Sequence, residues 1–296
     1  MINNIAVLIN TKNRVTELSL LLQSLRTQTY QKFDIFVYDD YGDNPNTNYH
    51  FFNCLITRLK LEDHFVFMRR TEFPHGVSKA RQAIVDWALQ YDYEYFCRLD
   101  DDCILESDYI EKLLNVIENG YDLATGVTVP MVGPSFKRDS KFISNGIMNR
   151  VILDNEGNYI LNNDDCGMEY LKTDNIFPAH HFRSCALYKT EIHKKVNYLP
   201  TRLSMHGFRE EQIFSYKLLL NGYKIGCDLN AVTWHQLTPS GGERGPNDQE
   251  LIRFNEQILN EWTKDHKDEL NKIFTKENMS SELELMKETN LAGRIK

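Results

Sequence analysis

The sequence lacks the features that mark secreted, membrane-spanning or zinc-ribbon proteins. Its six cysteines are scattered and form no Cys-x-x-Cys pair, so neither a disulfide framework nor a zinc site is indicated. No apolar run approaches the roughly 18 residues of a membrane span. The first residues contain no basic stretch followed by an apolar one, as a signal peptide would. We therefore expect a reduced, cytoplasmic protein without an integral membrane segment.

The charge balance is acidic and the rest of the composition is ordinary. A formal net charge of −8 argues against a dedicated DNA coat protein or a polybasic membrane binder. Apolar residues make up 42% of the chain, which is usual for a globular protein that buries a core. A length of 296 residues suits one large domain, or one domain with appendages.

In the first 130 residues, strand-like apolar runs alternate with stretches of helical periodicity. The expected strands are residues 5–9, 33–38 and 93–99, and the expected helices are residues 15–25, 79–89 and the segment that follows a cap at Ser107. Such alternation predicts βαβ units and therefore an α/β fold with a mostly parallel central sheet flanked by helices.

Beyond residue 130 the pattern becomes less regular. Residues 131–182 contain several turn signals, notably over 154–158, and indicate a β-rich or irregular excursion. After it we expect a helix over 210–221 that ends at Gly222, strands over 223–227 and 231–234, a loop over 239–246 and a helix over 248–274. The last 20 or so residues are charged and indicate a frayed tail or a loosely attached helix.

Polar clusters follow three of the expected strands. These clusters are residues 11–14, Asp39-Asp40 and Asp100-Asp101-Asp102. In open α/β sheets, ligands bind outside the carboxyl ends of the strands, so the three clusters are expected to share one site. Three adjacent carboxylates repel one another, and a hard cation such as Mg²⁺ or Mn²⁺ would offset that repulsion. The alternative for the triplet is a solvated turn or a helix N-terminus.

Four segments, in this order, resemble a glycosyltransferase of the GT-A fold and of the large inverting family 2. They are residues 5–14, 37–42, 76–82 and 98–102, which correspond to the first strand with its nucleotide loop, a strand ending in paired aspartates, a Gly-x-x-x-Ala-Arg helix start and the metal-binding Asp-x-Asp. The likeness covers residues 3–130 well and 180–237 moderately. It implies the nucleotide-diphospho-sugar transferase fold with a C-terminal helical extension.

The resemblance implies a donor site that contains a divalent metal. Asp100 and Asp102, with His235 as a third ligand, would hold Mn²⁺ or Mg²⁺, and Asp101 is the competitor within the triplet. The residues expected to bind the nucleotide sugar are Thr11, Asn13, Arg14, Asp39, Asp40, Lys79, Arg81, Asp100, Asp101 and Arg244. Arg244 lies in a glycine-rich loop and could move onto the diphosphate.

The candidate general base comes from the acidic pair Glu210-Glu211. Glu211 lies 11 residues before Gly222, the spacing that the resemblance implies for the catalytic acid, and Glu210 is held in reserve. The family carries aspartate where this chain has glutamate, whose side chain is one methylene longer. Either the backbone or the acceptor must therefore lie in a different position. The alternative is that both glutamates simply favour a helix N-terminus. The segment 180–184, which contains His180, His181, Arg183 and Ser184, is expected near the acceptor.

Together these observations predict a metal-dependent glycosyltransferase that transfers a sugar, with inversion, from a nucleotide diphosphate donor to a hydroxyl. A UDP-sugar is the expected donor, and the acceptor is a glycan, a lipid-linked sugar or a hydroxymethylated DNA base. The DNA acceptor would need a basic surface, for which the candidates are Lys137, Arg138, Lys141, Arg150, Lys194, Lys195 and Arg202.

Two other functions remain open, and the domain boundaries follow from the motifs. One is a nucleotidyltransferase acting on sugar phosphates, although residues 10–14 contain no glycine for its phosphate loop. The other is an inactive binding module, which the presence of metal and base candidates disfavours. We expect a glycosyltransferase domain over 1–237, with a nucleotide-sugar half (1–130) and an acceptor half (131–237), followed by a loop and helical extension over 238–296.

Overall fold

The computed structural model describes residues 3–131, 151–153, 159–161, 176–198, 202–243 and 248–273. Its first half runs β1 (Ile5–Thr11), α1 (Val15–Arg26), β2 (Phe33–Asp39), a short 3₁₀ turn (Asn46–Asn48), α2 (His50–Leu61), β3 (Val66–Arg70), α3 (Val77–Ala88), β4 (Tyr95–Asp100), β5 (Cys103–Leu105), α4 (Tyr109–Glu118) and β6 (Leu123–Pro130). The second half runs β7 (Val151–Leu153), β8 (Tyr159–Leu161), β9 (Ile176–Ala179), β10 (Ala186–Lys189), a 3₁₀ turn (Thr190–Lys194), α5 (Glu210–Leu220), β11 (Ile225–His235), α6 (Asp248–Asp265) and α7 (Lys267–Ile273).

A nine-stranded sheet forms the centre of the part of the chain that the structure describes. Its order is β3-β2-β1-β4-β10-β6-β11-β5, and β9 also pairs with β11. The pairs around β1 are parallel, as is the pair of β6 with β11, whereas β10, β5 and β9 join antiparallel to their neighbours. β10 therefore lies between the parallel strands β3-β2-β1-β4 and the pair β6-β11 in the sheet.

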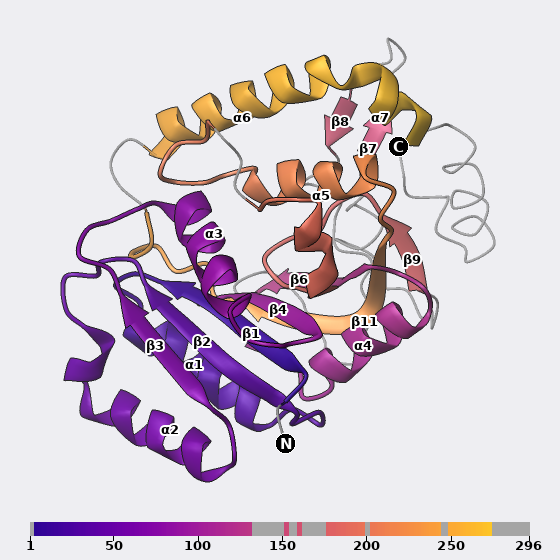
Figure 1. Cartoon of the computed structure of the whole chain (residues 1–296). Helices are drawn as coiled ribbons and strands as arrows, with labels where there is room; N and C mark the ends of the chain where they lie inside the picture. Colours follow the sequence, from indigo (N-terminus) through magenta and orange to yellow (C-terminus); the bar gives the residue numbers. More distant parts are fainter. Residues whose placement is uncertain are drawn as a thin grey trace.

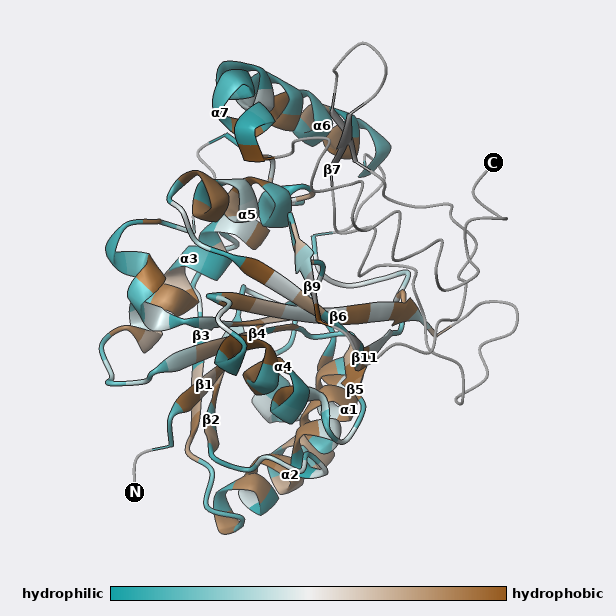
Figure 2. Ribbon diagram, turned by 90° about the vertical axis from the view of Figure 1, so that its right-hand side faces the viewer, coloured by the Kyte–Doolittle hydropathy of each residue, from teal (hydrophilic) through white to brown (hydrophobic). Residues whose placement is uncertain are grey.

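Alternation along the strands produces two hydrophobic cores, one on each face of the sheet. In β1, Ala6 and Leu8 point to the core that α3 and α5 cover. Ile5, Val7 and Ile9 point to the core that α1, α2 and α4 cover. Because both faces are buried, the strand is a continuous apolar run, as expected for a parallel sheet between helices. Figure 2 shows the apolar strands between helices whose outer faces are polar.

The C-terminal helices form a third layer on α5. Ile213 and Tyr216 of α5 pack against Ile258 and Leu259 of α6 and against Leu270 of α7. Figure 1 shows α6 lying across α5, on the side away from the sheet. None of the described helices is both long and apolar enough to span a membrane.

The α/β class and the expected elements of the first half are confirmed, with several corrections. α4 begins at Tyr109 after Asp108, and no side chain caps it, so the Ser107 cap was wrong. The strands expected over 223–227 and 231–234 are one strand, β11, with an irregular register between Cys227 and Val232. α2, β3, β5, β6 and β10 were not predicted. The turn expected over 154–158 lies outside the described residues.

Replacing Leu270 with alanine tests the contact between α7 and α5. Leu270 is fully buried, so we expect Leu270→Ala to lower the free energy of unfolding by about 2–5 kcal/mol in a urea titration. The matched control is Phe254→Ala on α6, whose side chain is 45% exposed and whose loss should change stability by no more than about 0.5 kcal/mol. Equal stabilities for the two variants would contradict this packing.

Candidate active site

The carboxyl ends of β1, β2 and β4 lie side by side and open into one pocket. The register pairs Thr11 with Asp39 and Asn10 with Asp100, because parallel strands end at the same edge of the sheet. The pocket has a volume of about 260 Å³. Its lining joins the first strand end to the aspartate triplet, the start of α5 and the end of β11.

The three aspartates of the triplet point to different partners. Arg81 of α3 and Arg98 of β4 both bind Asp100, the latter at 3.2 Å. Arg14 binds Asp101 at 2.9 Å and Asp102 at 3.0 Å. The arginines thus offset the repulsion among the carboxylates. Burial raises the pKa of Asp101 to about 6, and the charge of Arg14 opposes that rise.

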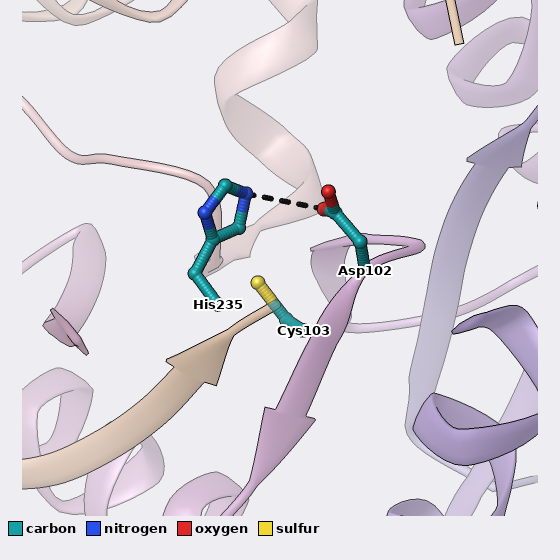
Figure 3. A group of neighbouring side chains, drawn as sticks. All are labelled: Asp102, Cys103 and His235. Carbon is teal, nitrogen blue, oxygen red and sulfur yellow. Dashed lines mark ion pairs between the residues drawn. The ribbon is translucent and has the colours of Figure 1, made fainter. Parts of the chain in front are cut away.

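Asp102 also meets His235, which comes from the end of β11. The Nε2 atom of His235 lies 3.2 Å from an oxygen of Asp102. With the sulfur of Cys103, their ligand atoms all lie within 4.8 Å of one another (Figure 3). Carboxylate oxygen and imidazole nitrogen are donors that suit Mn²⁺, so Asp102 and His235 could hold a divalent ion. Asp100 instead forms ion pairs with Arg81 and Arg98.

The acidic pair at the start of α5 is bound to β4 through Arg98. The Nη2 atom of Arg98 lies 2.8 Å from Glu210 and 2.9 Å from Glu211. Glu211 also accepts a hydrogen bond of 2.9 Å from the backbone N–H of Ser184. Both bonds fall on Oε1 of Glu211, which leaves Oε2 for a further partner. Glu211 lines the pocket.

Glu210 differs from Glu211 in burial. Its side chain is 4% exposed, against 17% for Glu211. Burial raises the pKa of Glu210 to about 7, opposed by the charge of Arg98. The more accessible Glu211 is therefore the better placed of the two to reach a substrate.

The loop after β11 packs onto the loop after β1. Gly242 donates its N–H to the carbonyl of Lys12 at 2.8 Å, and Arg14 donates Nε to the carbonyl of Ser240 at 3.1 Å. A methyl group on Gly241 would lie 2.5 Å from Cγ of Arg14, and the residue has a φ of +76°. Only glycine therefore fits there without strain. Arg244 lies outside the described residues.

Residues 6–196 match the family model described as "Glycosyl transferase family 2". The chain belongs to glycosyl transferase family 2. A search of curated proteins found no match.

Solved structures share the GT-A fold with this family 2 chain at low identity. GalNAc-T7 with UDP, GalNAc and Mn²⁺ is 16% identical, with a TM-score of 0.62 over 90% of this chain and 50% of that one. S. aureus TarS 1-349 is 17% identical, with a TM-score of 0.52 over 79% of this chain. The chain spans 60% of that TarS fragment. TarS 1-349 in complex with UDP-GlcNAc has a TM-score of 0.54 at 16% identity, covering 89% of this chain and 72% of that one.

Most of the residues that the sequence predicts for the family 2 site lie together in the pocket. These are Thr11, Arg14, Asp40, Arg81, Asp100, Asp101, Asp102, Glu210, Glu211, His235, His181 and Arg183. Asp40 lines the pocket, but its carboxylate accepts hydrogen bonds from the backbone of His75 and Gly76, which positions the start of α3.

Three predicted donor-site residues do not line the pocket. Lys79 is exposed, because a residue two positions before Arg81 on a helix lies on the opposite face. Asn13 is exposed and hydrogen-bonds Asp43. Asp39 accepts the N–H of Gly42 at 3.0 Å, and burial raises its pKa.

Arg98 was not predicted to have a role of its own, although it lies at the centre of the pocket. Its guanidinium carbon lies 5.1 Å from the ring centre of Phe182 and 5.8 Å from that of Tyr198, and its side chain is 3% exposed. The available signal was a charged residue within an apolar strand, which must have partners when buried. The segment before α5 was also missed, although His206 and Arg209 line the pocket.

The pH dependence of stability tests the burial of Glu210. Its pKa rises from the usual 4.5 to about 7 on folding, so the folded state binds the proton more tightly. That stabilisation is complete below pH 4.5 and is lost as the pH rises to about 7. Between pH 5 and 7 this loss gives the free energy of unfolding a slope of at most about 1.4 kcal/mol per pH unit, which we expect Glu210→Gln to remove. Urea titrations at several pH values measure it.

The matched control is Glu191→Gln in the 3₁₀ turn after β10, where the glutamate is exposed. This variant should keep the wild-type pH dependence. If Glu210→Gln also kept it, the raised pKa of Glu210 would be excluded.

Proposed function

We propose that this family 2 chain transfers a sugar from a UDP-sugar to an acceptor hydroxyl with inversion, using a divalent metal at Asp102 and His235 and Glu211 as the general base. The observation that carries the proposal is the meeting, in one pocket, of a metal-type donor pair and a pocket-lining carboxylate from α5. The structural neighbours solved with UDP, GalNAc and Mn²⁺ and with UDP-GlcNAc support the choice of donor and metal.

The donor end of the pocket carries the groups that a nucleotide diphosphate requires. When bound, a divalent ion at Asp102 and His235 would neutralise charge on the diphosphate as the bond to the sugar breaks. Arg14, held by Asp101 and Asp102, lies beside that position. Asp100, fixed by Arg81 and Arg98, presents carboxylate oxygens that can accept hydrogen bonds from sugar or ribose hydroxyls.

Glu211 supplies the base on the other side of the pocket. Arg98 and the N–H of Ser184 hold Oε1, so Oε2 can accept the proton of an acceptor hydroxyl. The resulting oxygen nucleophile bonds to the anomeric carbon while the bond from that carbon to the diphosphate oxygen breaks. One displacement on the face opposite the leaving group inverts the anomeric configuration.

For the acceptor, we propose a carbohydrate hydroxyl rather than a DNA base. Of the cations that a DNA acceptor would need, Lys194, Lys195 and Arg202 do not line the pocket. The other four lie outside the described residues. His181, Arg183, His206 and Arg209 line the pocket and offer hydrogen-bond donors that suit a glycan or a lipid-linked sugar. A nucleotidyltransferase is disfavoured, because the chain belongs to a glycosyltransferase family.

A donor screen tests the proposal as a whole. Each nucleotide sugar, with Mn²⁺, is assayed for its hydrolysis and for its effect on the midpoint of thermal unfolding. We expect a UDP-sugar to raise the midpoint in a concentration-dependent way and to be hydrolysed slowly, because a ligand that binds only the folded state stabilises it. The absence of any response to every donor would overturn the proposal.

Two conservative variants separate the proposed roles of the metal pair and the base. We expect Glu211→Gln to lower kcat by about 10²–10⁴-fold with donor binding retained, since the amide cannot accept the proton. Asp102→Asn should weaken both Mn²⁺ and donor binding in calorimetry. Glu191→Gln, an equally conservative change of an exposed carboxylate outside the pocket, is the control for each. Near-full transferase activity of either site variant would refute the role of that residue.

A further inference from the structure

Cys103 places a sulfur atom beside the proposed metal pair. It is the first residue of β5, directly after Asp102, and the antiparallel register sets it opposite His235. Cross-strand partners project their side chains to the same face of a sheet. Figure 3 shows the sulfur pointing toward the imidazole ring and the carboxylate.

The separations among the three ligand atoms suit one small ion. The Asp102 oxygen and the His235 nitrogen are 3.2 Å apart. Two ligands about 2.0–2.2 Å from a tetrahedral zinc ion would themselves be about 3.3–3.6 Å apart. All three atoms, including the sulfur, lie within 4.8 Å of one another, so a modest side-chain adjustment brings the sulfur to bonding distance.

We infer that Cys103 is a third metal ligand and that the site binds soft or borderline cations such as Zn²⁺ and Co²⁺ through an oxygen, nitrogen and sulfur donor set. This inference rests on the metal pair of the proposed function and adds the thiol to it. Sulfur ligands favour Zn²⁺ and Co²⁺ strongly over Mg²⁺, which prefers oxygen. As the metal–sulfur bond forms, the thiol proton leaves to solvent.

The consequence for the enzyme is selectivity among cations. A thiolate that occupies a coordination position takes the place of a water or a donor oxygen. Zn²⁺ is therefore expected to bind tightly and to inhibit transfer by competition with Mn²⁺ or Mg²⁺. Burial of Cys103 restricts the sulfur to ions that enter through the pocket beside His235, whose side chain is 17% exposed.

Cobalt spectroscopy tests the sulfur ligand without an activity assay, because only a thiolate gives an intense near-ultraviolet charge-transfer band to Co²⁺. The full chain is used with Cys54→Ser and Cys166→Ser. Cys54 is exposed and lies 3.4 Å from His50, so that pair could bind cobalt by itself. Cys166 lies outside the described residues. We expect Co²⁺ to produce the band in this background and Cys103→Ser to remove it.

The matched control is Cys97→Ser, a buried cysteine of β4 outside the three-residue group, which should retain the band. Calorimetry with Zn²⁺ and with Mg²⁺ should show that Cys103→Ser lowers the ratio of their affinities at least about tenfold. Circular dichroism and thermal unfolding identify any variant that fails to fold, and Cys103→Ala serves as a second probe.

The outcomes distinguish this inference from the proposed function. Two results would overturn the inference that Cys103 is a ligand while leaving the Asp102–His235 pair unaffected. One is cobalt binding that depends on His235 but gives no thiolate band, and the other is a band that persists in both Cys103 variants. Binding of cobalt or manganese that is unaffected by His235→Ala overturns the metal pair, and the inference falls with it.

Discussion

The side chain of Arg98 lies where the two halves of the chain meet, and it compensates carboxylates from both. One guanidinium nitrogen, Nη2, lies within 3.2 Å of Asp100 in β4 and of Glu210 and Glu211 in α5. A buried charge of this kind is stable only when paired, and each carboxylate would be costly to bury without it. The aspartate triplet after β4 and the acidic pair of α5 are therefore held together by one ion-pair network rather than by separate contacts.

The same compensation extends to the rest of the pocket. Arg14 and Arg81 hold the triplet, so five acidic side chains of the triplet and of α5 are shared among three arginines. Each arginine lies on a different element, namely the loop after β1, the helix α3 and the strand β4. The loop, the helix and the strand must therefore all be folded before the acidic groups can approach one another. This requirement couples the shape of the site to the stability of the fold.

The end of β11 adds the features that distinguish this site from a simple acidic cleft. His235 reaches Asp102, and the loop after it packs on the loop after β1 through Gly242 and Ser240. The antiparallel pairing with β5 also brings Cys103 to the proposed metal position. A strand late in the chain thereby completes a site whose first residues lie near the N-terminus.

The α/β class, most elements of the first half and the acidic residues that line the pocket could be predicted from the amino-acid sequence. Those conclusions rest on local signals: apolar runs, helical periodicity and motifs of a few adjacent residues. The sequence did not reveal α2, β3, β5, β6 or β10, nor that β11 is one strand. Asp40 and Lys79 both belong to segments that resemble the family. The carboxylate of Asp40 nevertheless binds the backbone before α3, and the side chain of Lys79 faces solvent.

Contacts in the folded protein set how the triplet is divided among its partners, which glutamate is accessible, and how close Arg98 lies to Glu211 and Cys103 to His235. Each of these depends on contacts between residues far apart in the chain, such as Arg98 with Glu211 and Asp102 with His235. No periodicity or spacing carries that information, because strand order and register set those distances.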